Sequence, residues 1–147
     1  ALGGWVSSNY AALACTDFPL CQGRWLPPMD FSHAFQLTRE LGKTADGGSL
    51  SREALTALHW THRVGALLTV VVVGALVWRA ARYSLLRGTA LLVLGLLLIQ
   101  VTLGVANVWF SLPLSIALSH NAGAALLLSA LTMLKFKAGS IATGPRS

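Results

Sequence analysis

The sequence predicts an all-α integral membrane protein with three membrane-spanning helices. Of its 147 residues, 54% are hydrophobic and only 11% are charged, whereas about 25% of the residues in a typical soluble domain are charged. A membrane-spanning helix needs about 20 mostly apolar residues, and three stretches meet this requirement: 58–78, 88–110 and 114–134. The composition excludes intrinsic disorder, which requires a polar, charge-rich chain, and argues against an ordinary soluble globule.

The distribution of charge predicts how these helices are oriented. All five acidic residues lie before residue 58, whereas residues 58–147 carry seven basic residues and no acid. The basic residues gather in the link 79–87 and the tail 135–147, and loops rich in Lys and Arg face the cytoplasm. We therefore expect a periplasmic segment 1–57, a three-helix bundle 58–134 and a cytoplasmic tail 135–147. The net charge of +6 reflects this topology, and no nucleic-acid partner is predicted.

The periplasmic segment has two expected helical parts. Residues 1–6 resemble the end of an apolar helix, so we expect the chain to lack most of a preceding membrane helix. An amphipathic helix is predicted from Met29 to Leu41, with Asp30 as its N-cap and Gly42 as its end. Its apolar face would lie on the membrane surface or on the helix bundle.

The two cysteines, Cys15 and Cys21, both lie in the periplasmic segment. An oxidising compartment favours a disulfide between them. Because the enclosed loop is short, the bond would stabilise the fold by about 2 kcal/mol in the chain-entropy model. A structural staple and a redox-active pair both remain open. A metal site is disfavoured because the chain has no CxxC spacing.

Histidines in the apolar helices predict a haem site. His62 and His120 lie about 24 Å and about 21 Å before the cytoplasmic ends of their helices, at 1.5 Å per residue. They are therefore expected at a similar depth near the outer surface. Each is followed at i+3 and i+4 by Gly and Ala, beginning with Gly65 and Gly123. Because these offsets share a helix face, each histidine has a flat patch against which a macrocycle could lie. We expect one haem between the first and third helices, ligated by His62 and His120.

Neighbouring polar residues have several open interpretations. His59 lies one turn before His62, so the two cannot approach iron from opposite faces; a second-shell donor, a haem propionate contact or an outer-surface residue are the alternatives. Arg63 has no acid in any membrane segment to pair with, so it would bind a propionate or extend to the outer interface. Gln100 is expected to form interhelical hydrogen bonds. A proton or ion pathway, or helix packing by the small residues, would also explain the histidine pattern.

Three motifs carry a resemblance to a known family. They are residues 2–23, which contain Cys15-Thr-Asp-Phe-Pro-Leu-Cys21, then His59-Trp-Thr-His-Arg-Val-Gly65, and Leu118-Ser-His-Asn-Ala-Gly123. Together they resemble the haem A synthase family of bacterial inner membranes and mitochondria. The resemblance implies an eight-helix protein with two similar four-helix halves, each with two histidines for a haem. It also implies that this chain is the C-terminal half without its first helix.

The resemblance also implies an activity. Members convert haem O to haem A by oxidising a ring methyl to a formyl group, and are therefore oxidoreductases. In the N-terminal half a Glu typically stands where this chain has His59, so no catalytic residue is assigned here. The implied role of this segment is to hold a bis-histidine haem b that transfers electrons, and the segment alone is expected to be inactive. Implied partners are haem O, the lipid bilayer, and haem O synthase or other cytochrome oxidase assembly proteins.

Other classes of function share some of these features. A b-type cytochrome subunit would use the same histidines for electron transfer without making haem A. A membrane thiol oxidoreductase would use Cys15 and Cys21 at the outer face. An assembly factor without a cofactor would need neither the histidines nor the cysteines for chemistry.

Overall fold

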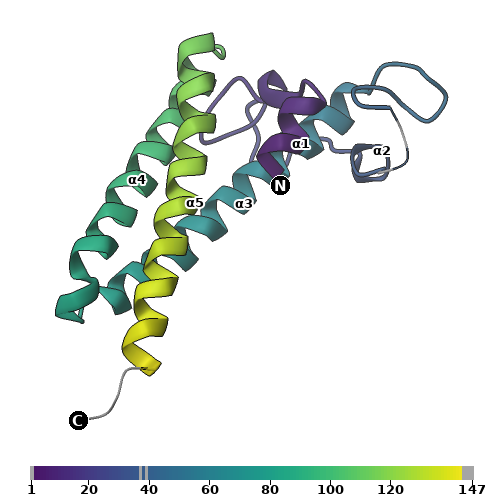
Figure 1. The fold of residues 1–147 in the computed structure, drawn as a ribbon. Coiled ribbons are helices and arrows are strands. Elements are labelled where there is room, and N and C mark those ends of the chain that lie inside the picture. Colours follow the sequence, from purple (N-terminus) through teal and green to yellow (C-terminus); the bar gives the residue numbers. More distant parts are fainter. Residues whose placement is uncertain (1, 37, 39, 144–147) are drawn as a thin grey trace. The chain divides into compact units, whose positions relative to one another are not determined.

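The computed structural model describes residues 2–36, 38 and 40–143. The described chain is helical throughout its regular elements, with isolated β-bridges at Cys21–Arg24 and Lys43–Ser49 and no extended strand. The elements are α1 (Leu2–Ser8), the 3₁₀ helix η1 (Ala11–Leu13), α2 (Phe31–Ala34), α3 (Arg52–Ala80), α4 (Ser84–Trp109) and α5 (Leu114–Thr143), drawn in Figure 1. The predicted all-α class is therefore confirmed.

Three of the described helices, α3, α4 and α5, are long and apolar enough to cross a membrane. They contain nearly all of the three predicted spans, and α3 begins at Arg52, before the membrane span itself. This start follows from Ser51, whose hydroxyl accepts the Ala54 N–H at 3.1 Å and caps the helix. Most side chains in the apolar windows are not covered by this chain. Such faces suit contact with lipid or with other apolar helices.

One compact unit comprises residues 68–104 and the described part of 114–147. In Figure 1, α4 and α5 run side by side in this unit. Small residues such as Ala90 and Ala130 are almost fully buried where the helices approach, as is common in membrane helix packing. The buried apolar cluster consists of Val73, Val77, Ala80, Leu86, Ala90, Val93, Leu97, Leu127, Ala130 and Leu134.

Hydroxyl groups on the exposed sides of α4 and α5 bond to their own helices. Thr102 donates to Leu98 O, Ser129 to Ala125 O and Thr132 to Leu128 O, each at 2.9 Å. These i−4 bonds satisfy the hydroxyl protons without water. Polar side chains therefore remain compatible with an apolar environment on these faces.

The second unit contains the described residues up to 67 together with 105–113. Its core packs the segment before residue 52 onto the beginning of α3, and includes Val6, Ala11, Ala34, Leu50, Ala54, Ala57 and Leu58. The indole of Trp5 donates to Ala34 O at 3.2 Å. The buried side chain of Asn9 accepts the Gly42 N–H at 3.1 Å. Segments far apart in the sequence are thus joined by side chain–backbone bonds.

The helix predicted from Met29 to Leu41 is a single turn, so its predicted extent is wrong. Helix α2 ends at Ala34, and residues 37 and 39 of the expected helix lie outside the described residues. The helix is short because most of its expected apolar face is not buried: Ala34 is fully buried, but Phe31 and Leu41 are 47% and 50% exposed. So short a helix is not stable by itself and depends on packing. Asp30 is its N-cap, as predicted, and accepts the His33 N–H at 3.2 Å.

The cap predicts a response of α2 to acid. The Ser32 hydroxyl, followed by the side chain and backbone N–H of His33, lowers the pKa of Asp30 from 3.8 to about 2. A carboxyl group with a lowered pKa contributes stability above its unfolded pKa, and this is lost as the pH falls through its folded value. We expect the α2 turn to open between about pH 4 and about pH 2. The chemical shifts of the Asp30 carboxyl and the His33 amide would follow it, and Asp30→Asn would remove this acid transition.

Candidate functional site

A disulfide closes the loop between Cys15 and Cys21, which confirms the predicted pairing. Both residues are buried, with exposed fractions of 0% and 2%. Thiol–disulfide exchange requires a thiolate to reach one of the sulfur atoms. Burial of both cysteines therefore favours a structural staple over a redox-active pair.

The disulfide loop is bound to one face of α3. Thr56, His59, Trp60 and Arg63 follow the i, i+3, i+4, i+7 pattern of a single helix face, and we call them the loop-binding face. Arg63 donates to Leu20 O at 2.7 Å and to Cys15 O at 3.0 Å. The indole of Trp60 donates to Trp25 O at 3.0 Å, and the Gln22 amide donates to Thr56 Oγ1 at 2.8 Å. The loop therefore lies on α3 through several independent bonds.

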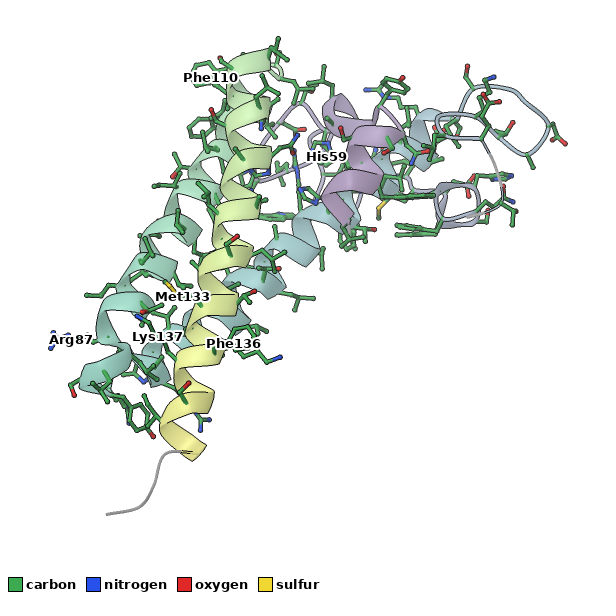
Figure 2. All side chains as sticks on the ribbon, in the orientation of Figure 1. His59, Arg87, Phe110, Met133, Phe136 and Lys137 are labelled. Atoms are coloured by element: carbon green, nitrogen blue, oxygen red, sulfur yellow. A yellow bond between two sulfur atoms is a disulfide. The ribbon has the colours of Figure 1, made fainter. Side chains whose placement is uncertain are left out.

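His59 belongs to this face and is only 5% exposed. Its Nδ1 accepts the Cys15 N–H at 3.3 Å, so Nδ1 carries no proton in this arrangement. Figure 2 labels the residue. The expectation of an outer-surface residue is thus wrong, because the loop covers the ring. A contact with a haem propionate remains a prediction.

Asp17 is a residue of this site that sequence reasoning missed. Its two carboxylate oxygens accept the N–H groups of Gln22 at 2.7 Å and Gly23 at 2.8 Å. The bond from Gly23, with support from Gln22 and from the charge of Arg63, lowers the pKa of Asp17. The only signal in the sequence was an Asp inside a loop with turn residues, a combination that favours side chain–backbone bonds. Arg63 therefore has a carboxylate in its electrostatic surroundings, although from outside the membrane segments.

His62 is half-buried on α3, and α1 lies against it. A Cβ built on Gly3 would be 3.5 Å from Cε1 of the His62 ring. The predicted flat patch at Gly65 is covered within this unit, because a Cβ there would lie only 2.7 Å from a methyl group of Leu2. The lack of a side chain at Gly65 thus allows α1 to approach α3. A role for Gly65 in holding a macrocycle remains a prediction.

His120 lies on α5 against α4. A Cβ built on Gly104 would be 3.2 Å from its ring, so Gly104 provides space for the imidazole. The amide nitrogen of Gln100 donates to His120 O at 2.9 Å and lies 3.4 Å from Nε2 of the ring. The interhelical hydrogen bond predicted for Gln100 is therefore confirmed. The side chain of Gln100 also covers Gly123, where a Cβ would lie 2.5 Å from Oε1.

These surroundings fit axial ligation in their donor chemistry. Each imidazole lies against a glycine of another helix, and Nδ1 of His120 is buried without a hydrogen-bond partner in the described structure. No cluster of three or more His, Cys, Asp or Glu side chains that could hold a metal ion occurs among the described residues. A haem iron that is ligated by two histidines does not require such a cluster. His62 and His120 belong to different compact units.

Comparisons with known proteins identify relatives over most of the chain. A family model described as cytochrome oxidase assembly protein matches residues 1–132. The "Heme A synthase" of Shewanella oneidensis is 43% identical over 135 residues, which cover 92% of this chain and 41% of the relative. The "Heme A synthase" of Halalkalibacterium halodurans is 32% identical over 133 residues, which cover 88% of this chain and 37% of the relative.

The similarity extends to a plant protein. "Heme A synthase COX15" of Arabidopsis thaliana is 27% identical over 135 residues, which cover 90% of this chain and 27% of the relative. The chain spans roughly two fifths or less of the length of these three curated relatives. No solved structure matches the chain.

Proposed function

Because the chain belongs to the family of cytochrome oxidase assembly proteins, we propose that it acts in haem A biosynthesis as the haem b-holding segment of a haem A synthase. The observation that carries the proposal is the similarity to proteins named heme A synthase over about nine tenths of the chain. The enzyme would be an oxidoreductase that converts haem O to haem A by oxidising a ring methyl to a formyl group. Neither the substrate nor a catalytic residue is assigned to this segment.

His62 and His120 would be the axial ligands of a haem b. A b-type haem with two histidine ligands supplies electron transfer, because its iron has no open coordination position. His62 and His120 each present an imidazole from an apolar helix, where an ionisable group is rarely found without a function. Gly3 and Gly104 lie next to these rings, where the absence of a side chain lets each helix approach the imidazole closely.

The disulfide loop would cover the periplasmic side of this site. Its role would be to keep the backbone of Cys15 on α3, where the Cys15 N–H donates to His59 and the Cys15 carbonyl accepts from Arg63. The Nε atom of Arg63 is buried without a partner in the described chain. This N–H is the group that would donate to a haem propionate. Haem O synthase or other cytochrome oxidase assembly proteins would be partners of the complete enzyme in the bacterial inner membrane.

Two alternatives predict different observations. A b-type cytochrome subunit would bind haem in the same way without supporting haem A formation. A thiol oxidoreductase would require the Cys15–Cys21 bond to be attacked by an external thiolate, and the burial of both cysteines disfavours this function. The proposed enzyme therefore differs from the first alternative in its product and from the second in its need for histidines.

A chimera tests the function directly. The matching 135 residues of the Shewanella relative would be replaced with this chain in a strain that lacks its own haem A synthase, and haem A would be extracted and quantified. We expect haem A to form with the chimera and to be absent with the 147-residue chain expressed alone. A chimera that is inserted, binds haem and makes no haem A would contradict the enzyme and favour the cytochrome subunit.

A further inference from the structure

An open pocket lies at the turn between α3 and α4. It has a volume of about 350 Å³ and is lined by Trp78, Arg79, Arg82 and Tyr83, and we call it the arginine pocket. All four residues belong to the unit that contains residues 68–104. Backbone bonds fix the turn, because the Arg82 N–H donates to Arg79 O at 3.4 Å and the Tyr83 N–H donates to Ala80 O at 3.0 Å. The two arginines are therefore held close together in the chain fold.

The arginine pocket carries two positive charges that no carboxylate of this chain balances. Residues 58–147 contain no Asp or Glu, and neither guanidinium takes part in an ion pair or a side-chain hydrogen bond among the described residues. The guanidinium carbon of Arg82 lies 5.4 Å from the centre of the Trp78 ring, a cation–π contact that orients the charged group. Helix α4 begins at Ser84 with no acidic residue in its first turn, and the N–H groups of a helix N-terminus favour anions. The pocket is therefore suited to an anion with several oxygen acceptors.

The place of the pocket along the membrane helix indicates the source of the anion. The apolar run of α3 ends at Trp78 and the pocket is complete five residues later, so the pocket lies where the hydrocarbon core meets the lipid headgroups. Trp and Tyr are enriched at this depth because their rings are amphipathic, and the side chains of Trp78 and Tyr83 are 68% and 61% exposed. Phospholipids present phosphate at the same depth, and arginine binds phosphate oxygens through pairs of N–H groups.

We propose that the arginine pocket binds the phosphate group of an anionic phospholipid, with Arg79 and Arg82 donating to its oxygens and Trp78 and Tyr83 beside its glycerol region. The net charge of the lipid matters, because a zwitterionic headgroup brings its own cation and leaves the charge of the pocket unbalanced. An anionic headgroup such as phosphatidylglycerol supplies the missing negative charge. This site goes beyond the proposed role in haem A biosynthesis and does not depend on it.

Native mass spectrometry of the 147-residue chain in detergent tests the site. The chain would be titrated with phosphatidylglycerol or phosphatidylcholine at about 0.2 M salt, where distant charges are screened. We expect tighter binding of phosphatidylglycerol than of phosphatidylcholine. Arg79→Gln and Arg82→Gln should each bind phosphatidylglycerol at least about tenfold more weakly, as expected when a charged donor is lost. The matched control is Arg87→Gln, which makes the same charge change near the start of α4 but does not line the pocket, and it should bind as the original chain does.

Three outcomes would overturn the proposal. Equal binding of the two lipids would remove the preference for an anion, and equal losses in Arg82→Gln and Arg87→Gln would leave only a diffuse attraction of positive charge. Displacement of phosphatidylglycerol by excess inorganic phosphate would assign the pocket to a free ion instead of a lipid.

A conservative variant separates loss of the site from loss of the fold. Arg82→Lys keeps the positive charge but lacks the planar guanidinium that pairs with phosphate oxygens. With a helix content by circular dichroism equal to that of the original chain, it should bind phosphatidylglycerol more weakly than the original chain and more tightly than Arg82→Gln. Unchanged binding by Arg82→Lys would contradict recognition of the phosphate through the guanidinium.

Discussion

Alanine at either His62 or His120 is expected to abolish the low-spin b-type spectrum of the haem-loaded chain. The reduced-minus-oxidised difference spectrum should lose its sharp bands, because iron with one protein ligand no longer has the bis-histidine coordination that produces them. His33→Ala is the matched control, since His33 is exposed in α2, far along the chain from the apolar helices. It should leave the spectrum unchanged.

Added imidazole distinguishes a lost ligand from a lost fold in these variants. If His120→Ala remains folded, free imidazole should occupy the vacated position and restore the low-spin bands. The same should hold for His62→Ala. A low-spin spectrum that persists in either variant without imidazole would show that this histidine is not an axial ligand.

Replacement of Arg63 by methionine is expected to give the largest loss of stability in the unit that contains the disulfide loop. The change removes donors to Leu20 O at 2.7 Å and Cys15 O at 3.0 Å, and hydrogen bonds from a charged donor contribute about 1.5–3 kcal/mol each. The combined contribution of the two bonds is reduced because this side chain is partly exposed. We therefore expect a loss of about 3 kcal/mol in the free energy of unfolding. Unfolding in mixed detergent micelles would measure it. Arg82→Met is the control, because Arg82 is exposed on the turn after α3 and should change stability by less than about 0.5 kcal/mol.

The disulfide should couple to Arg63 in a double-mutant cycle. Replacing both cysteines with alanine removes about 2 kcal/mol of stabilisation in the chain-entropy model. Because Arg63 and the disulfide restrain the same loop, the combined variant should lose less than the sum of the two separate losses. Additive losses would show that they act independently, and equal losses in Arg63→Met and Arg82→Met would contradict the role of the loop-binding face.

The membrane helices and the disulfide could be predicted from the sequence because their signals are local or unique. Apolar runs of sufficient length specify α3, α4 and α5, and Cys15 and Cys21 had no other cysteine to pair with. The extent of α2 could not be predicted in this way. Its hydrophobic pattern favoured a helix to Leu41, but a pattern does not reveal how much of the apolar face is buried, and Phe31 remains exposed.

The environment of the histidines was only partly accessible to sequence reasoning. A polar residue such as Gln100 in an apolar helix predicts a bond to another helix, which the structure contains. The partners of His59 and Arg63 were not predictable, because they are backbone atoms 43 to 48 residues away in the sequence. Gly65 and Gly123 were predicted to be flat patches for a macrocycle, and this stays a prediction; within the chain the groups that approach them are Leu2 and Gln100.

The loop-binding face and the disulfide loop that it binds differ in their tolerance to substitution. His59, Trp60 and Arg63 use side-chain atoms, whereas their partners are the backbone of Cys15, Leu20 and Trp25. Every amino acid carries the same carbonyl group, so Leu20 and Trp25 can change identity without loss of these bonds. The helix can bind any loop that follows the same path, and an engineered protein could exchange the loop residues while keeping α3 intact.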